Sequence, residues 1–119
     1  MVSSPGPDQI HFDMPSPART LIISCIENGL RKIGDTSERA TIYFVESRSG
    51  ITLTEFPSHP EILIKTLRDV FGTGSVFLLK AIVDELDSTT SDDGAVVAHV
   101  RTFSKAVDRG IRAIESRRM

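Results

Sequence analysis

The sequence predicts an all-α fold, a compact bundle of about five helices whose last helix is long and amphipathic. Three observations carry this prediction. Apolar residues recur at helical spacing along most of the chain, proline or glycine marks the segment boundaries, and the final segment keeps heptad spacing. At 119 residues, the chain is expected to form one helical domain over residues 16–119, behind a flexible, proline-rich leader at residues 1–15.

The first expected helix covers residues 18–33. Ser16 and Pro17 supply an N-cap followed by proline at the first helical position, and Gly34 ends the helix. Gly29 costs up to about 1 kcal/mol relative to alanine inside a helix, but it would permit close approach of a second helix. The residues expected to face the core are Leu21, Ile22, Cys25, Ile26, Leu30 and Ile33.

Residues 40–47, ATIYFVES, are β-branched and aromatic and therefore suit either a helix or a strand. The pattern supports equally a helix over residues 38–47 and an α+β alternative with a hairpin at about 40–56. An N-cap at Thr36 or Ser37 favours the helix.

Residues 58–86 predict two helices joined by a glycine turn. Ser58 and Glu61 have the spacing of a capping box, and Pro60 falls in the first turn. Gly72 lies where a helix C-terminus favours positive φ. The expected apolar stripes are Ile62, Leu63, Leu67, Val70 and Phe71 in the first helix, and Val76, Phe77, Leu78, Leu79, Ile82, Val83 and Leu86 in the second.

Part of the chain also resembles a known family. The similar residues are Gly50, Ile51, Leu53, His59-Pro60-Glu61, Leu67, Phe71-Gly72-x-Gly74, Ile82 and Leu86. From about Ile42 to Leu86, the chain resembles the small archaeal helical domain described as the Nitrosopumilus output domain. The resemblance implies an all-helical fold, an archaeal source and a signalling context with another signalling protein as partner, and it supplies no catalytic residue. It also favours the helical interpretation of residues 40–47.

An acidic loop is expected at residues 87–93, followed by a helix over residues 94–117 that Asp92 or Asp93 would cap. One side of this helix carries apolar residues at alternating spacings of four and three. This stripe either completes the core of the single chain or forms the face of a homodimer, which we take as the expected partner. The candidate dimer face is Val96, Val100, Phe103, Val107, Gly110 and Ile114.

The opposite side of the same helix is basic and suggests an alternative function. Arg101, Lys105, Arg109 and Arg112 lie within about a quarter-turn of one another and could neutralise nucleic-acid phosphates. However, Asp108 lies beside them, no aromatic residue is interleaved for base stacking, and the net charge of the chain is −2. A solvated helix face is the simpler interpretation.

No pattern of reactive residues predicts a catalytic, cofactor or metal site. Cys25 lies among isoleucines in the middle of a helix, where it is expected to act as a small core hydrophobe. His11, His59 and His99 are too far apart in sequence to form a local metal motif. We therefore expect a protein that is not an enzyme and that binds no cofactor.

The single cysteine excludes an internal disulfide and suits the reducing cytoplasm. The sequence contains neither a secretory signal pattern nor a run of about 20 apolar residues, so cytoplasmic location without membrane association is expected. Together these features predict a non-enzymatic regulatory or protein-interaction domain that dimerises through its C-terminal helix.

Overall fold

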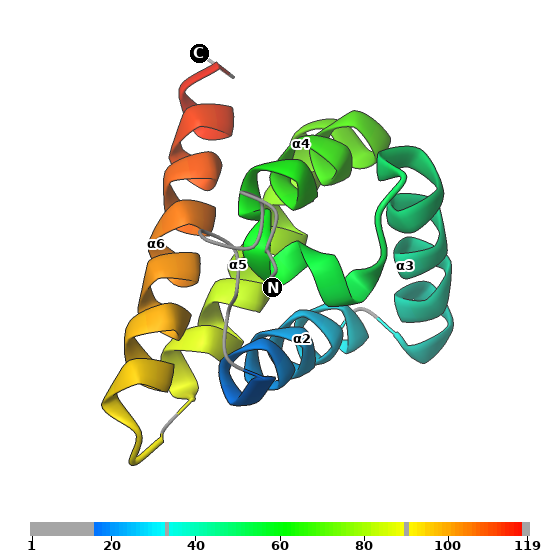
Figure 1. The fold of residues 1–119 in the computed structure, drawn as a ribbon. Helices are drawn as coiled ribbons and strands as arrows, with labels where there is room; N and C mark the ends of the chain where they lie inside the picture. The colour runs from blue at the N-terminus through cyan, green and yellow to red at the C-terminus, as the bar shows by residue number, and fades with distance from the viewer. Residues whose placement is uncertain (1–15, 33, 90, 118–119) are drawn as a thin grey trace, which may run out of the picture.

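The computed structural model describes residues 16–32, 34–89 and 91–117, and these residues form helices and the turns between them (Figure 1). The α-helices are α2 (Ser16–Arg31), α3 (Asp35–Ser49), α4 (Pro60–Phe71), α5 (Ser75–Ser88) and α6 (Gly94–Arg117), with the 3-10 helices η1 (Leu53–Ser58) and η2 (Gly72–Gly74). The all-α prediction is confirmed. The alternative hairpin at 40–56 is not supported, because α3 and η1 occupy those residues. The expected leader at 1–15 lies outside the described residues.

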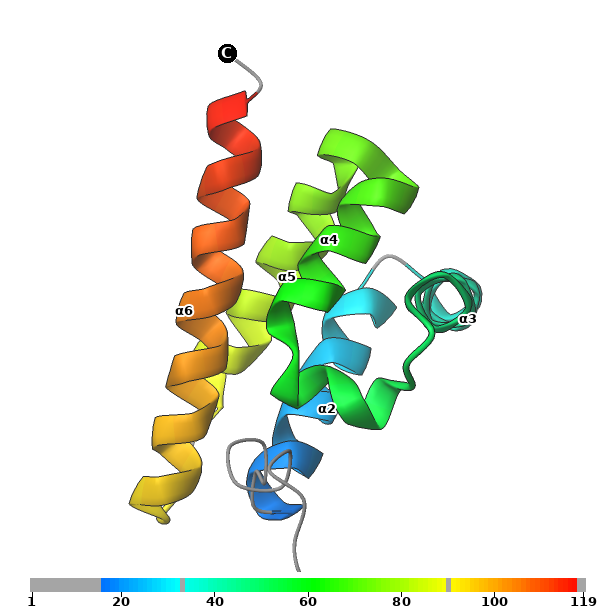
Figure 2. The same cartoon turned by 45° about the horizontal axis from the view of Figure 1, so that its top comes forward.

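Helix α5 lies at the centre of the fold and packs against α2, α4 and α6. Figures 1 and 2 show α6 and α3 at opposite edges of the molecule, with the other helices between them. All five α-helices and η1 therefore contribute to one hydrophobic core. Its largest fully buried apolar side chains are Phe56, Phe103, Ile22, Ile26, Leu63, Leu67, Leu79, Ile82 and Val107.

The contact between α2 and α5 depends on Gly29. A Cβ atom at this position would lie only 2.8 Å from the backbone nitrogen of Ile82 and 2.9 Å from its Cα. No side chain larger than hydrogen fits between the two helices here without displacing one of them. The prediction that Gly29 permits close helix approach is confirmed.

Helix boundaries differ from the predicted ones in three places. The first helix covers Ser16–Arg31, two residues earlier than expected, and α3 covers Asp35–Ser49 with Gly34 as its N-cap. Helix α5 continues through Ser88, so the acidic connection is shorter than the predicted loop at 87–93. The last helix has its predicted bounds, and its predicted cap forms because the Asp93 carboxylate accepts from the backbone N–H groups of Ala95 and Val96 at 2.9 and 3.4 Å.

The N-cap of α4 differs from the predicted one. The N-cap residue is His59 rather than Ser58, and its carbonyl oxygen accepts from the N–H groups of Ile62 and Leu63. Ser58 instead ends η1, because the N–H of His59 already donates to the carbonyl of Phe56 in the preceding turn. The helix therefore begins one residue later than the capping-box spacing predicts, because a 3-10 turn includes Ser58.

Candidate interaction surface

Helix α3 turns its aromatic residues toward solvent and polar residues toward the protein. Tyr43 and Phe44 are 66% and 52% exposed, whereas Glu38 and Thr41 are buried. Among the described side chains of α3, Val45 is the one that belongs to the buried hydrophobic core. Exposed large apolar groups together with buried polar groups are the informative departures from ordinary burial. The pattern therefore indicates a contact made on the outer face of α3.

An ion pair between α2 and α3 fixes this orientation. The Arg31 guanidinium donates from Nε to Glu38 Oε1 at 3.1 Å and from Nη2 to Glu38 Oε2 at 3.3 Å. This bidentate arrangement compensates the buried carboxylate and specifies which side of α3 faces α2. Tyr43 and Phe44 are consequently held outward, and their rings pack edge to face with centroids 5.8 Å apart.

A groove of about 400 Å³ opens beside Phe44. Its far wall includes Phe71 at the end of α4 and Phe77 in α5, which are 39% and 79% exposed. Gly72 has φ 61°, and the Ser75 hydroxyl donates to its carbonyl oxygen at 2.7 Å, so the chain reverses tightly between these two phenylalanines. The residues that line the groove are Ala40, Thr41, Phe44, Val70, Phe71, Gly74, Phe77 and Leu78.

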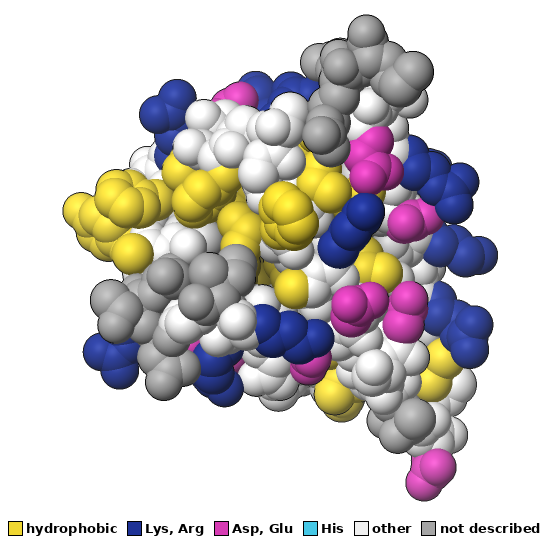
Figure 3. Space-filling model, turned by 180° about the vertical axis from the view of Figure 1, so that it is seen from behind, with side chains coloured by type: hydrophobic (Ala, Val, Ile, Leu, Met, Phe, Trp, Pro, Cys, Tyr) yellow, Lys and Arg dark blue, Asp and Glu magenta, His cyan; other side chains and the backbone are white. Residues whose placement is uncertain are grey.

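We call Tyr43, Phe44, Phe71 and Phe77 together the aromatic surface. Figure 3 shows hydrophobic side chains gathered on this side of the molecule, running from the α3 edge toward the middle of the face. With about 200 Å² for each aromatic side chain, the exposed fractions correspond to roughly 450 Å² of aromatic area. Contiguous apolar patches of about 300–600 Å² are the largest on typical monomers and often serve as binding sites.

The apolar stripes predicted for residues 58–86 include Phe71 and Phe77 among the aliphatic core residues, whereas both phenylalanines are exposed. Phe77 and Leu79 differ by about 200° around a helix, and so do Ile42 and Phe44, so neither pair can face one core. In both helices the residue that packs inward is the aliphatic one, while the phenylalanine is exposed. A helix with apolar residues on two opposite sides is the sequence signal from which such a surface could be found.

The stripe predicted as a dimer face is covered within the single chain. Val96, Val100 and Phe103 are buried in the core, as are the later apolar residues of the same stripe, Val107 and Ile114. Gly110 lies against α4, where a Cβ atom would approach the Ile64 side chain at 2.8 Å. Burial therefore supports the other interpretation, in which α6 completes the core, and it gives no support to a dimer through this stripe.

The predicted nucleic-acid face is exposed on the outer side of α6. Arg101, Lys105, Arg109 and Arg112 are all exposed to solvent. The last three line a shallow furrow of about 590 Å³ between α5 and α6. Acidic residues Asp87 and Asp108 line the same furrow, and Asp108 forms an i,i+4 ion pair with Arg112 at 3.2 Å, which lowers the positive charge available to a phosphate.

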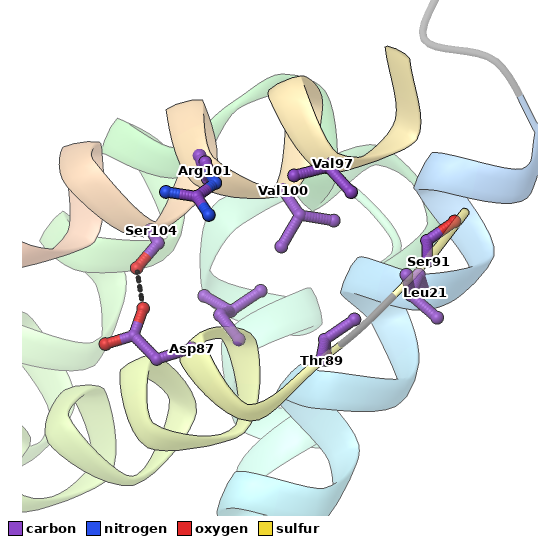
Figure 4. Close-up of a pocket in the computed structure, with 9 residues that line it drawn as sticks. Leu21, Asp87, Thr89, Ser91, Val97, Val100, Arg101 and Ser104 are labelled. Atoms are coloured by element: carbon purple, nitrogen blue, oxygen red, sulfur yellow. Dashed lines mark hydrogen bonds between the residues drawn. The ribbon is translucent and has the colours of Figure 1, made fainter. Parts of the chain in front are cut away.

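A smaller hollow of about 230 Å³ lies where α6, the end of α5 and the start of α2 meet (Figure 4). Leu21, Val97 and Val100 supply apolar walls. The Ser104 hydroxyl donates to the Asp87 carboxylate at 3.0 Å across it and so joins α5 to α6. Because ligand pockets usually measure about 300–1,000 Å³, this hollow is small for an organic ligand.

Cys25 is buried in the core as predicted, with Sγ 3.1 Å from Thr89 Oγ1. Burial raises the pKa of the Cys25 thiol, the hydrogen bond with Thr89 lowers it by less than burial raises it, and the negative charge of Glu85 adds a smaller increase. The thiol is therefore protonated at neutral pH, which disfavours nucleophilic chemistry at this position. Within residues 16–32, 34–89 and 91–117, no three His, Cys, Asp or Glu side chains are grouped to hold a metal ion.

None of the described helices is both long enough and apolar enough to cross a membrane. No family model, curated protein or solved structure matches the chain. The resemblance of residues 42–86 to the Nitrosopumilus output domain therefore stays a prediction.

Proposed function

We propose that this chain is a non-enzymatic protein-interaction domain that contacts its partner through the aromatic surface. The observation that carries the proposal is the arrangement of α3, which buries Glu38 and Thr41 while it exposes Tyr43 and Phe44. Aromatic residues are enriched at protein interfaces, where they provide large contact areas at low cost in side-chain entropy.

The adjoining groove supports the same function. Its wall combines α3 with the ends of α4 and α5, and Phe71 and Phe77 frame its mouth. A concave apolar site next to protruding aromatic residues suits the anchors of a protein partner, which usually fill pockets near the centre of an interface.

Site-directed photo-crosslinking in cells that naturally produce the protein tests this proposal. We expect a photoreactive phenylalanine analogue at Tyr43 to form an adduct with another protein chain, and the adduct to disappear when Phe77→Asp is added. The same analogue at Thr102, which is exposed on α6, is the matched control. Equal adducts at both positions, or none at Tyr43, would contradict the proposal. Mass spectrometry of the adduct identifies the crosslinked chain.

Other parts of the proposed function rest on the sequence. The resemblance of residues 42–86 supports a regulatory role in archaeal signalling with another signalling protein as partner. The single cysteine supports a cytoplasmic location.

A second candidate function is nucleic-acid binding by Arg101, Lys105, Arg109 and Arg112, because all four side chains are exposed on one side of α6. In that case, the affinity for a mixed-sequence duplex should fall steeply with salt, and reversal of all four charges should abolish binding. Reversal of Arg39 and Arg48, which are exposed on α3, is the control. Fluorescence anisotropy with labelled duplex measures both effects, and equal loss in the control would indicate only a bulk charge effect.

A further inference from the structure

The partner of the aromatic surface can be inferred from its size and from the charges beside it. Its roughly 450 Å² of aromatic area is more than half of the about 800 Å² that each partner buries in a standard interface. The groove walls and the adjoining backbone of α3 and α5 extend the same surface. The aromatic side chains of one copy therefore supply more than half of the area that a standard interface needs from each chain.

The side of the surface formed by α3 is basic. Arg39 and Arg48 are both exposed, and neither forms an ion pair with any other described residue. Arg48 follows Phe44 by one helical turn, so the two side chains share a face of α3. The remaining charged side chains described in this helix, Glu38 and Glu46, are engaged with Arg31 and with the backbone N–H of Leu53.

The side formed by α5 is acidic. Asp84 is exposed and follows Phe77 by two helical turns, which puts it on the same face of α5. Its carboxylate forms no ion pair in the described part of the chain, whereas the charge of nearby Lys80 is compensated by Glu115 at 3.1 Å. One side of the aromatic surface therefore carries uncompensated positive charge, and the opposite side carries uncompensated negative charge.

The directions of the two helices make this arrangement self-complementary. In Figure 1, α3 runs upward along the right edge while α5 runs downward toward the left, so their C-terminal halves lie at opposite corners of the surface. A twofold axis that lies in the plane of the face seen in Figure 3, at right angles to the line between these corners, would set each corner of one chain against the opposite corner of a second chain packed face to face. It would bring the acidic side of one chain against the basic side of the other.

We propose that the aromatic surface binds a second copy of this chain across a twofold axis. Phe77 of each chain packs at the groove of the other, and Asp84 of each chain faces Arg48 of the other. This inference rests on the proposed function, because it names the partner of the same surface. It replaces the apolar stripe of α6 as the face that brings two chains together.

A charge-swap series on the full chain tests the proposal by sedimentation equilibrium. Wild type should show a concentration-dependent monomer–dimer equilibrium, and Arg48→Asp or Asp84→Arg alone should weaken it about tenfold, because each dimer then contains two like-charge pairs. The double variant should restore it. An equimolar mixture of the two single variants should form heterodimers, because both ion pairs are then correct. Arg109→Asp, on the far helix α6, is the control with the same charge change.

Two results would overturn the inference: a wild type that stays monomeric at every concentration, or a double variant no tighter than the single ones. Phe77→Asp should also abolish the dimer while retaining the helical circular dichroism signal, since this side chain is 79% exposed. The Tyr43 crosslink separates the two proposals. An adduct with a different protein, in a monomeric chain, refutes the dimer and leaves the interaction function standing. An adduct only with residues 1–15 of the same chain, or no adduct at all, refutes both.

Discussion

The contact between α2 and α5 predicts an unusual response to a helix-favouring substitution. Gly29→Ala removes a residue that costs up to about 1 kcal/mol inside a helix, so propensity alone would stabilise the protein. The added Cβ, however, would lie 2.8 Å from the backbone nitrogen of Ile82 and 2.9 Å from its Cα. Carbon atoms pack at about 3.5–4.0 Å, so the two helices must separate by roughly 0.7 Å.

The expected magnitude follows from these opposing effects. Overpacking of a well-packed core costs about 1–3 kcal/mol, and backbone atoms cannot move away as a side-chain tip can. The contact lies at the centre of the fold, where α5 meets three other helices, so the cost is expected near the top of that range. After the propensity gain, we expect Gly29→Ala to lower the free energy of unfolding by about 2 kcal/mol.

Gly110→Ala is the matched control because it makes the same change inside another helix. The three atoms nearest to an added Cβ at Gly110 all belong to the side chain of Ile64, the closest also at 2.8 Å. Ile64 is partly buried and can turn away, so this variant should stay within about 1 kcal/mol of wild type. Urea unfolding followed by far-UV circular dichroism measures both free energies. A Gly29→Ala protein as stable as wild type would refute the reasoning.

Double-mutant cycles sharpen the test. Ile64→Ala should relieve the strain of Gly110→Ala, which gives a favourable coupling energy between these two sites. Ile82→Ala should not relieve Gly29→Ala to the same degree, because contacts with the backbone of residue 82 remain. Equal coupling in the two cycles would show that side-chain crowding, rather than backbone contact, limits both glycines.

Three other predictions concern single side chains. Asp93→Ala should lower the free energy of unfolding by about 1 kcal/mol through loss of the α6 cap, whereas neighbouring Asp92→Ala should change it by less than about 0.5 kcal/mol in urea titrations. Phe103→Ala should cost about 3–5 kcal/mol because the ring is buried, and Phe77→Ala should leave the same unfolding midpoint nearly unchanged. The folded-state pKa of Cys25 is raised, so the unfolded chain loses its thiol proton first as pH rises. Wild type should therefore lose stability relative to Cys25→Ala above about pH 8.5, by at most about 1.4 kcal/mol per pH unit. If the free energies of unfolding of the two proteins changed equally from neutral to alkaline pH, the prediction would be wrong.

The helices could be predicted from sequence wherever local chemistry determines them. Asp93 caps α6 as its position implies, and the aliphatic and aromatic residues of the apolar stripe that follows it are buried. The predicted N-cap of α4 at Ser58 was wrong because Ser58 ends η1, a 3-10 helix that contains the buried Phe56. Such a turn is a tertiary effect and leaves little trace in hydrophobic spacing.

The interaction surface could not be predicted from sequence because its residues look like core residues. Phe77 and Leu79 are both apolar, and only the positions of α2, α4 and α6 around α5 decide which of them is covered. The same holds for α3, where the ion pair between Arg31 and Glu38 joins a residue of one helix to a residue of the next and selects the inward side. Hydrophobic periodicity shows that a helix face is apolar, but the positions of the neighbouring helices determine whether that face is buried or exposed to solvent.

Because α3 is anchored by so little apolar area, its local opening should require less free energy than unfolding of the whole chain. Val45 is its fully buried hydrophobic side chain among the described residues, with Ile42 only partly buried. Backbone amides of α3 should accordingly exchange with solvent before those of α5. A partner that binds only when α3 is folded against the protein must then stabilise this folded state, and the stabilisation grows as more of the protein is bound. Affinity at this surface would therefore be adjustable by residues on the hidden side of α3 that never touch the partner, and amide exchange in one helix would report on binding.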